Sequence, residues 1–413
     1  MRNFEKAKRI VIKIGTNTLT KKGTVEIDTA YVRRIVRQVH SLLKTGRQVV
    51  IITSGAIGMG AGQLSGYRDI RISGHQRIRG SGKGEGQSGL AGKVHPVRKS
   101  DAGRPNIRRL ISNGVKDIKM QQACAAIGQP LLMAEYRKSF ARYGVTVAQV
   151  LLTTEVLNNR KTYLNLRNSI ETLLKLGVVP ILNENDSVST EEIGSTFGDN
   201  DKLSALVASK IDADLLIMLS DVDALYDKNP RKFADAKPIP AVYEITADIV
   251  RNAAGTGSKY GTGGMKTKIE AAKIASNAGC RMVLANGRAK NVISRIIAGE
   301  EIGTIFMPKR KLSNRARWIL NSSPAGVINI DEGAMRAVRA HKSLLPSGVI
   351  SVEGSFEAGD VVMLNDNAKA VTSLSSLQLK ELAGKHSTEI KKLLGPKHRD
   401  VVAIPEDIVL IDY

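Results

Sequence analysis

The segment RIVIKI, residues 9–14, is a short apolar run whose only interior charge is Lys13. After it, apolar residues recur at helical spacing as far as Gly46, and a second apolar run, QVVIIT, occupies residues 48–53. Here two strands that are apolar on both faces are separated by an amphipathic helix. This pattern is typical of a parallel sheet covered by helices. Residues 9–53 therefore predict a β-α-β unit of an α/β protein.

The same alternation continues as far as residue 306. Apolar runs predict strands at 145–152, 178–183, 215–220 and 282–286, and periodic segments predict helices near 119–142, 161–176, 201–210, 265–278 and 290–298. Regular alternation of the two kinds of segment predicts one domain, residues 1–306, with an open, mostly parallel sheet sandwiched between helices.

The pattern changes after residue 306. Residues 307–323 are rich in charge and predict a linker, and short apolar pieces between glycines follow, such as GVINI, GVISVEG and GDVVML. Residues 324–413 therefore predict a small β-rich domain.

Composition limits the class of protein and its partners. The 62 Lys and Arg residues exceed the 39 Asp and Glu residues and give a net charge of +23, which favours anionic partners such as nucleotides, acidic metabolites or RNA. The N-terminal apolar run is too short for a signal peptide, and no run is long enough to span a bilayer, so we expect a cytoplasmic protein without a membrane partner. Cys124 and Cys280 lie in apolar contexts and predict buried small side chains rather than a disulfide or a metal site.

Residues 68–116 fit neither domain pattern. This segment holds twelve Lys or Arg residues, three Asp or Glu residues and nine glycines, with few periodic apolar residues. We expect a surface insertion that adds little to a packed core. A loop that contacts RNA is the alternative, although the segment lacks the aromatic residues that such loops use for stacking on bases.

Ligands of open α/β sheets bind beyond the carboxyl ends of the strands, so the loops that follow the strands are candidate sites. Lys13 lies inside the first strand just before Gly15, and the second strand is followed by the small residues of TSGAIGMGAG, residues 53–62. A buried lysine is costly unless it meets an anion. For Lys13 the alternative is a side chain that reaches solvent at the edge of the strand. For residues 53–62 the alternative is an ordinary tight turn between a strand and a helix.

The stretch NENDSVSTEEIGSTFGDND, residues 183–201, concentrates carboxylates and amides. Some of these side chains would cap the helix that follows, but their number exceeds what capping requires. Carboxylates bind an ammonium group and amides orient a substrate, so this stretch predicts a site for an amino acid. The residue spacing of an EF-hand calcium loop is missing.

A glycine-rich stretch, KYGTGGMKTK at residues 259–268, directly precedes a predicted helix. It matches neither the P-loop nor the dinucleotide-binding fingerprint. Free N–H groups at a helix N-terminus nevertheless attract anions, and Lys268 opposes the helix dipole unless a phosphate lies in front of it. An ordinary glycine loop with a surface lysine is the alternative.

Together these motifs resemble the amino acid kinase family. They occur in the family's order and spacing, and the resemblance covers residues 7–66 and 117–306, while the C-terminal part from Pro324 resembles a PUA domain, a small β-rich barrel. The motifs are Lys13-Ile-Gly-Thr, Thr53-Ser-Gly-Ala, Asn183-Glu-Asn-Asp186, Gly198-Asp-Asn-Asp201, Ser220-Asp221 and Gly261-Thr-Gly-Gly-Met-Lys-Thr-Lys268. Family members usually have a much shorter connection where residues 68–116 stand here, which leaves open whether the insertion is tolerated or obstructs the site.

The resemblance implies a role for each matching residue. Lys13 and Lys268 would flank the transferred phosphoryl group, and Asp201 would hold both lysines in place. Ser54, Asp186 and Asn200 would bind glutamate. The residues implied to contact ATP are Lys13, Ser220, Asp221, Thr262, Gly263, Gly264, Met265, Lys266, Thr267 and Lys268.

The implied reaction is transfer of a phosphoryl group from ATP to the γ-carboxylate of L-glutamate, the first step of proline biosynthesis. Mg2+ would be held mainly by the ATP phosphates and by water rather than by protein side chains. The product would be an acyl phosphate prone to cyclise, so we expect its transfer to the reductase that makes glutamate semialdehyde. The family further implies a dimer or tetramer.

Two alternatives remain open at this point. The first alternative is an RNA-binding protein built on a kinase fold that has lost activity. It would bind RNA through its PUA-like domain and its basic insertion. The presence of Lys13, Asp201 and Lys268 argues against this alternative. Another kinase of the same fold, acting on N-acetylglutamate, is the second, but that substrate lacks the ammonium that Asp186 would bind.

Overall fold

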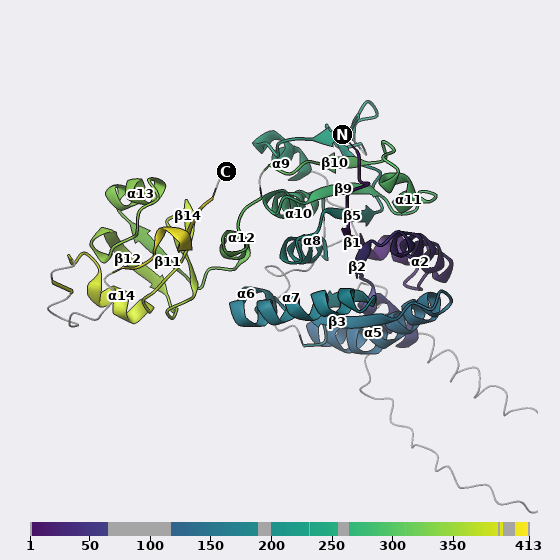
Figure 1. Cartoon of the computed structure of the whole chain (residues 1–413), viewed down its shortest axis with the longest axis horizontal. Helices are drawn as coiled ribbons and strands as arrows, with labels where there is room; N and C mark the ends of the chain where they lie inside the picture. The colour runs from purple at the N-terminus through teal and green to yellow at the C-terminus, as the bar shows by residue number, and fades with distance from the viewer. Residues whose placement is uncertain are drawn as a thin grey trace, which may run out of the picture.

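The computed structural model describes residues 2–64, 117–188, 200–230, 232–254, 264–309, 311–386, 389–390 and 401–411. The predicted insertion at 68–116 and residues 259–263 of the glycine-rich stretch lie outside these residues. A larger α/β part and a smaller β-rich part are joined through helix α12 (Figure 1).

The larger part contains the sheet that the alternation predicts. Its eight strands have the order β3-β4-β2-β1-β5-β9-β10-β8, and pairing is parallel from β3 to β9. Strand β10 pairs antiparallel with β9 and parallel with β8. The strands are β1 (Arg9–Ile14), β2 (Gln48–Ile52), β3 (Val147–Leu152), β4 (Val179–Glu184), β5 (Leu215–Ser220), β8 (Ala241–Val242), β9 (Arg281–Asn286) and β10 (Thr304–Phe306).

Helices cover both faces of this sheet. One hydrophobic cluster contains residues of α2 (Thr29–Lys44), α5 (Ile118–Ala141) and α11 (Val292–Ile297). The other contains residues of α7 (Arg160–Lys175), α8 (Asn200–Lys210) and α10 (Met265–Asn277). In β1 successive residues alternate between the clusters, because side chains of a strand point to opposite faces. The predicted three-layer α/β fold is confirmed.

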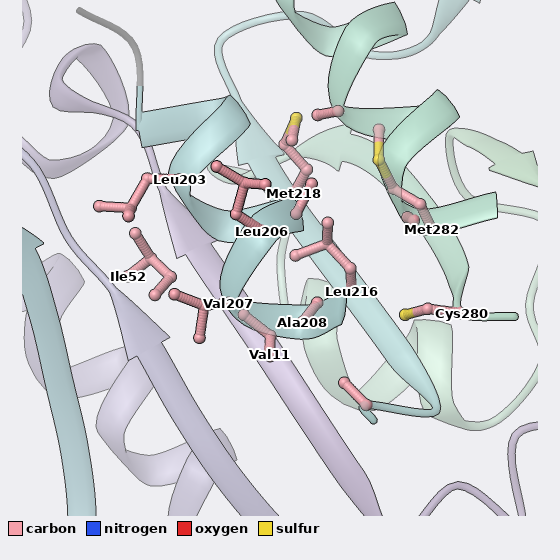
Figure 2. Packing of buried hydrophobic residues seen from close by; sticks show 14 of the residues in the cluster. Val11, Ile52, Leu203, Leu206, Val207, Ala208, Leu216, Met218, Cys280 and Met282 are labelled. Carbon is pink, nitrogen blue, oxygen red and sulfur yellow. The ribbon is translucent and has the colours of Figure 1, made fainter. Parts of the chain in front are cut away.

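Helix α8 is buried along nearly its whole length, because it lies between the sheet and α10. Leu203, Leu206 and Val207 pack against Val11 and Ile52 of the strands (Figure 2). Burial of each such side chain contributes roughly 1.5–3 kcal/mol. The first residues of α8 are thereby fixed at the carboxyl end of the sheet.

Several short elements have no counterpart in the sequence pattern, because segments of a few residues show no periodicity. Residues 56–64 are also helical, after β2. The other additions in the larger part are strands β8 and β10 of the large sheet, α1 (Thr16–Leu19), α6 (Thr154–Asn158), β6 (Leu225–Tyr226), β7 (Pro238–Ile239) and α9 (Ala247–Ala254).

The smaller part contains a five-stranded sheet with the order β12-β11-β13-β14-β15 and its own hydrophobic core. Its strands are β11 (Gly326–Ile330), β12 (Val349–Gly354), β13 (Val361–Leu364), β14 (Ala368–Val371) and β15 (Ile408–Leu410). Its helical elements are α13 (Glu332–Arg339), η1 (Pro346–Gly348), α14 (Ser376–Leu382) and η2 (Pro405–Asp407).

The stretch expected to be a linker, 307–323, contains helix α12 (Asn314–Asn321). Trp318 and Ile319 pack against Val361 and Val371 of the smaller part. The indole nitrogen of Trp318 also donates a 3.1 Å hydrogen bond to the carbonyl of Asn158 in the larger part. The segment therefore binds both parts rather than only connecting them.

Within the ranges that the structure describes, no helix is both long enough and apolar enough to cross a lipid bilayer.

Candidate active site

The sheet order brings the candidate loops together. Strands β4, β2, β1 and β5 are consecutive neighbours in the sheet, and all four run parallel. Their carboxyl ends therefore lie side by side at one edge. The loops that hold Gly15, Ser54, Asp186 and Asp221 all leave this edge.

Two lysines and one aspartate form the centre of this edge. The ammonium of Lys13, from β1, lies 2.5 Å from Oδ1 of Asp201, and that of Lys268, from α10, lies 2.9 Å from Oδ2. Asp201 is fully buried, and the lysines are 5% and 6% exposed. Three segments far apart in the sequence thus place two cations on one carboxylate, and the cluster carries a net positive charge.

The charge state of Asp201 follows from these contacts. Burial alone would raise the pKa of its carboxyl, but the charges of Lys13 and Lys268 outweigh burial and hold the pKa well below its ordinary value. Thr267 donates a further hydrogen bond of 3.1 Å to Oδ2. Asp201 is therefore ionised and fixes both ammonium groups.

Asn200 lies next to this cluster and is held by the neighbouring strand ends. The two hydrogens of its amide nitrogen are shared among three acceptors, the carbonyl of Thr53 at 2.9 Å, Oγ of Ser54 at 2.7 Å and Oδ1 of Asn183 at 3.1 Å. Its own Oδ1 is buried and has no hydrogen-bond partner among the described residues. An acceptor in this state is suited to a donor group of a ligand.

Asp186 follows β4 in a partly buried turn. Burial raises the pKa of its carboxyl to about 6. The turn is anchored by Asn185, whose backbone nitrogen donates to the carbonyl of Leu152 at 2.7 Å and whose side chain accepts from Ser187. A carboxylate whose charge is destabilised by burial is suited to a cationic ligand.

Ser220 and Asp221 follow β5. Oγ of Ser220 donates to Oδ1 of Asp221 at 3.1 Å, and the amide of Asn17 donates to Oδ2 at 3.1 Å. Burial raises the pKa of Asp221, but the hydrogen bonds, with that from Asn17 first among them, lower it below its ordinary value overall. Asn17 was missed from the sequence because its helix, α1, is a single turn.

Helix α10 begins directly after Gly264, which provides no side-chain cap for its first N–H groups. A Cβ placed at Gly264 would have no neighbour within 4 Å among the described residues. Met265 packs against the core and Lys266 is exposed. Thr262 and Gly263 lie outside the described residues.

The buried residues Gln129 and Tyr136 of α5 were also missed. Asn183 donates to Oε1 of Gln129 at 2.8 Å, and the hydroxyl of Tyr136 lies 3.0 Å from that of Thr53. Both residues contact strand ends that carry predicted site residues. The signal in the sequence is a glutamine between Gly128 and Pro130, within the otherwise apolar residues 123–134 of the helix.

A surface groove of about 800 Å³ lies elsewhere and is not lined by any of the predicted site residues. Among the described residues, no cluster of three or more His, Cys, Asp or Glu side chains could hold a metal ion. The cationic edge of the sheet therefore remains the candidate site.

Known proteins are similar to this chain along nearly its whole length. Residues 8–286 match the amino acid kinase family, and residues 326–394 match the PUA domain. The chain is 43% identical to a glutamate 5-kinase of Methanosarcina mazei, over 99% of this chain and 97% of the relative. It is 41% identical to that of Methanosarcina acetivorans, with the same coverage, and 40% identical to that of Caldanaerobacter subterraneus, over 98% of each chain.

Among solved structures, UMP kinase from Bacillus anthracis is 14% identical, with a TM-score of 0.44 over 74% of this chain and 98% of that chain. The family match spans more than half of the chain, and the curated relatives align over nearly all of it. The chain belongs to the amino acid kinase family and carries a C-terminal PUA domain.

Proposed function

We propose that this chain transfers the γ-phosphoryl group of ATP to the γ-carboxylate of L-glutamate, giving γ-glutamyl phosphate and ADP in the first step of proline biosynthesis. The observation that carries the proposal is the buried cluster of Lys13, Asp201 and Lys268. The choice of substrate is supported by the glutamate 5-kinases that align with nearly the whole chain.

The cluster suits the demands of phosphoryl transfer, which needs in-line positioning and cations around the equatorial oxygens of the moving group. An oxygen of the γ-carboxylate attacks the γ-phosphorus while the bond to the bridging oxygen of ADP breaks. A carboxylate is already ionised, so no general base is required. Lys13 and Lys268 would neutralise the transferred group, and the ionised Asp201 would keep them in place beforehand.

The amino acid would lie on the side of β2 and β4. The unpartnered Oδ1 of Asn200 and the carboxylate of Asp186 would accept hydrogen bonds from the substrate ammonium, and Ser54 would contact a carboxylate. Aspartate is shorter by one methylene, and N-acetylglutamate has no ammonium. Neither is expected to be a good substrate.

The nucleotide would lie over the other half of the edge, toward Ser220, Asp221 and the N-terminus of α10, which has no side-chain cap. The N–H groups there and Lys266 suit phosphate binding. Thr262 and Gly263 are proposed contacts on the basis of the motif alone.

The donor set tests whether a resident metal fits. The carboxylate of Asp201 is occupied by two lysines, and the described residues hold no cluster of metal ligands. This arrangement fits Mg2+ that arrives with ATP and is held by phosphates and water. When bound, such an ion would neutralise charge on the nucleotide phosphates.

A hydroxylamine trap tests the proposal, because hydroxylamine converts an acyl phosphate into a hydroxamate. We expect hydroxamate from L-glutamate with Mg-ATP, and far less from aspartate or N-acetylglutamate. Lys268→Ala should abolish the product, whereas Lys273→Ala, at an exposed position of the same helix, should not. Equal product from both variants, or none from the wild-type chain, would contradict the proposal.

The product also suggests a protein partner. The free α-amine of γ-glutamyl phosphate can attack its own acyl phosphate and close a five-membered lactam, 5-oxoproline. We therefore propose transfer to the glutamate semialdehyde dehydrogenase that reduces the product. Adding that reductase at equal flux should lower the yield of 5-oxoproline, and an unchanged yield would count against transfer.

RNA is a further proposed partner, through the PUA domain and its exposed basic residues Arg336 and Arg339 on α13. RNA retention should weaken as salt rises and be lost after truncation at residue 323. Absence of binding at low salt would exclude this role.

We also propose a homo-oligomer, as a dimer or tetramer, which light scattering on the purified chain can measure.

A further inference from the structure

A chain of three amide side chains connects helix α5 to the proposed amino acid site. Asn183 donates from Nδ2 to Oε1 of Gln129 at 2.8 Å, and its Oδ1 accepts from Nδ2 of Asn200 at 3.1 Å. Gln129 is 8% exposed and Asn183 is 2% exposed. We call Gln129, Asn183 and Asn200 the amide chain.

Helix α5 reaches the strand ends because Gly128 has no side chain. A Cβ at this position would lie 1.8 Å from the carbonyl oxygen of Ala56, which no side chain tolerates. The close approach places Gln129 beside Asn183, and Tyr136, two turns later on the same face of the helix, beside Thr53. The amide chain is therefore fixed by tight packing on its α5 side.

Acceptors at both ends of the amide chain, the Thr53 carbonyl and Oε1 of Gln129, require the same direction of the amides between them. The carbonyl oxygen of Thr53 can only accept a hydrogen bond, so the nitrogen of the Asn200 amide must face it. Asn183 must then turn its oxygen toward Asn200 and its nitrogen toward α5. Gln129 supplies the acceptor that this nitrogen needs, while its own Nε2 is buried without a hydrogen-bond partner among the described residues.

The same arrangement leaves Oδ1 of Asn200 as a buried acceptor without a partner among the described residues. An unpaired buried acceptor is unfavourable until a donor reaches it. A site that presents such an acceptor discriminates strongly against ligands that lack the donor. The direction of the amide chain therefore bears on substrate choice.

We propose that Gln129 is a positioning residue that acts through Asn183 to hold the amide of Asn200 with its oxygen toward the substrate ammonium. This inference rests on the proposed function and deepens it, because it assigns selection of the α-amino group to a residue two contacts away from the substrate. Gln129 itself touches no reacting atom.

The first test is Gln129→Met, which keeps the approximate volume of the side chain but removes the acceptor. We expect the KM for L-glutamate to rise about tenfold, the equivalent of one hydrogen bond to a charged group. The KM for ATP and kcat should stay within about twofold, because the lysine cluster is not part of the amide chain.

The matched control is Gln38→Met. Gln38 is also a buried glutamine, 7% exposed, and it accepts from the backbone of Ile293 and Ser294. Both variants lose a buried hydrogen bond and should lose thermal stability, but Gln38→Met should leave the KM for glutamate unchanged. Gln129→Glu, which retains an oxygen toward Asn183, should recover most of the lost affinity and provides a second variant should the first fail to fold.

Two further measurements separate positioning from a general loss of structure. The preference for L-glutamate over glutarate, which lacks the amino group, should fall in Gln129→Met by about the same factor as KM rises. In an Asn183→Ala background, Gln129→Met should produce no additional rise, because its effect passes through Asn183.

Any of three results would overturn the inference. These are an unchanged KM for glutamate in Gln129→Met, an equal rise of that KM in Gln38→Met, and additive effects of the Gln129 and Asn183 substitutions on KM. Failure of the wild-type chain to phosphorylate glutamate is a separate result and would overturn the proposed function instead.

Discussion

Helix α8 has an aspartate at each end, and each aspartate pairs with several cations. Asp201, in the first turn, is fully buried between Lys13 and Lys268. Asp212, just after the last turn, has a 25% exposed side chain and contacts Arg167, Lys311 and Arg317. Similar charges in similar numbers thus stand at both ends of one buried helix.

The difference lies in what else the cations contact. At the first end the lysines lie at the carboxyl edge of the sheet, and Lys268 stands in the first turn of α10, whose N-terminus has no side-chain cap. At the other end Arg317 of α12 also donates to the carbonyl of Ser209, so its hydrogen bonds join the linker helix to α8. We propose that the first cluster serves a ligand, whereas the second joins α8 to the helix that packs against the PUA domain.

The largest expected effect separates the two clusters directly. Asp201→Asn leaves two buried ammonium groups without a counter-charge, and loss of one partner from a buried ion pair costs roughly 3–5 kcal/mol. We also expect kcat to fall on the order of 10³-fold or more, because displaced lysines no longer meet the phosphoryl group. Steady-state kinetics and thermal denaturation of the purified variant measure both. Near-normal kcat would show that the cluster is structural, like that of Asp212.

The next expected effect concerns a carboxylate at the same edge that forms no ion pair with any residue the structure describes. The pKa of Asp186 is raised to about 6 by burial, and only the ionised form can bind a substrate ammonium. As the pH falls below about 6, the KM for glutamate should therefore rise, approaching tenfold per pH unit, while above about 7 it should be flat. Asp186→Asn should raise KM and remove this break. A break that persists in the variant would assign it to another group.

A smaller effect is expected at the other end of α8. Asp212→Asn weakens the contacts of α12 but leaves the sheet edge intact, so kcat and both KM values should stay within about twofold. Because the cluster is partly exposed, we expect the free energy of unfolding to fall by only about 1 kcal/mol. Calorimetry and kinetics on the same preparation test this. A fall in kcat like that of Asp201→Asn would remove the distinction between the two ends.

The smallest effect involves Lys210, next to the second cluster. Its ammonium lies 3.7 Å from the centre of the Tyr163 ring, and burial, reinforced by the charge of Arg317, lowers its pKa to about 7. Between about pH 7 and about pH 10 the unfolded chain binds this proton more tightly than the folded chain does. The free energy of unfolding therefore rises with pH over this range.

Lys210→Met should therefore stabilise the protein at pH 7, on the order of 1 kcal/mol, and the gain should shrink toward pH 10. Melting curves of both proteins across this range measure the difference. A gain that does not depend on pH would show that Lys210 does not titrate as expected.

Local patterns predicted most of the fold because each depends on residues close in the chain. The alternation of apolar strands with helices is visible in RIVIKI and QVVIIT, and the long helices are found within a few residues of their expected bounds. Elements of one turn, such as α1, show no periodicity and were missed together with Asn17. Helix α12 was also missed, because residues 307–323 read as charged and irregular.

The sequence by itself determined the α/β architecture, the C-terminal β-rich domain and the identity of Lys13, Asp201 and Lys268 as candidates, because strand periodicity and short motifs are local. Only the tertiary structure decided which side chains meet. Asp201 and Lys268 are 67 residues apart, Gln129 and Asn183 are 54 apart, and Asn200 and Thr53 are 147 apart. The order of strands in the sheet and the close approach of α5 at Gly128 bring these pairs together, and neither follows from spacing along the chain.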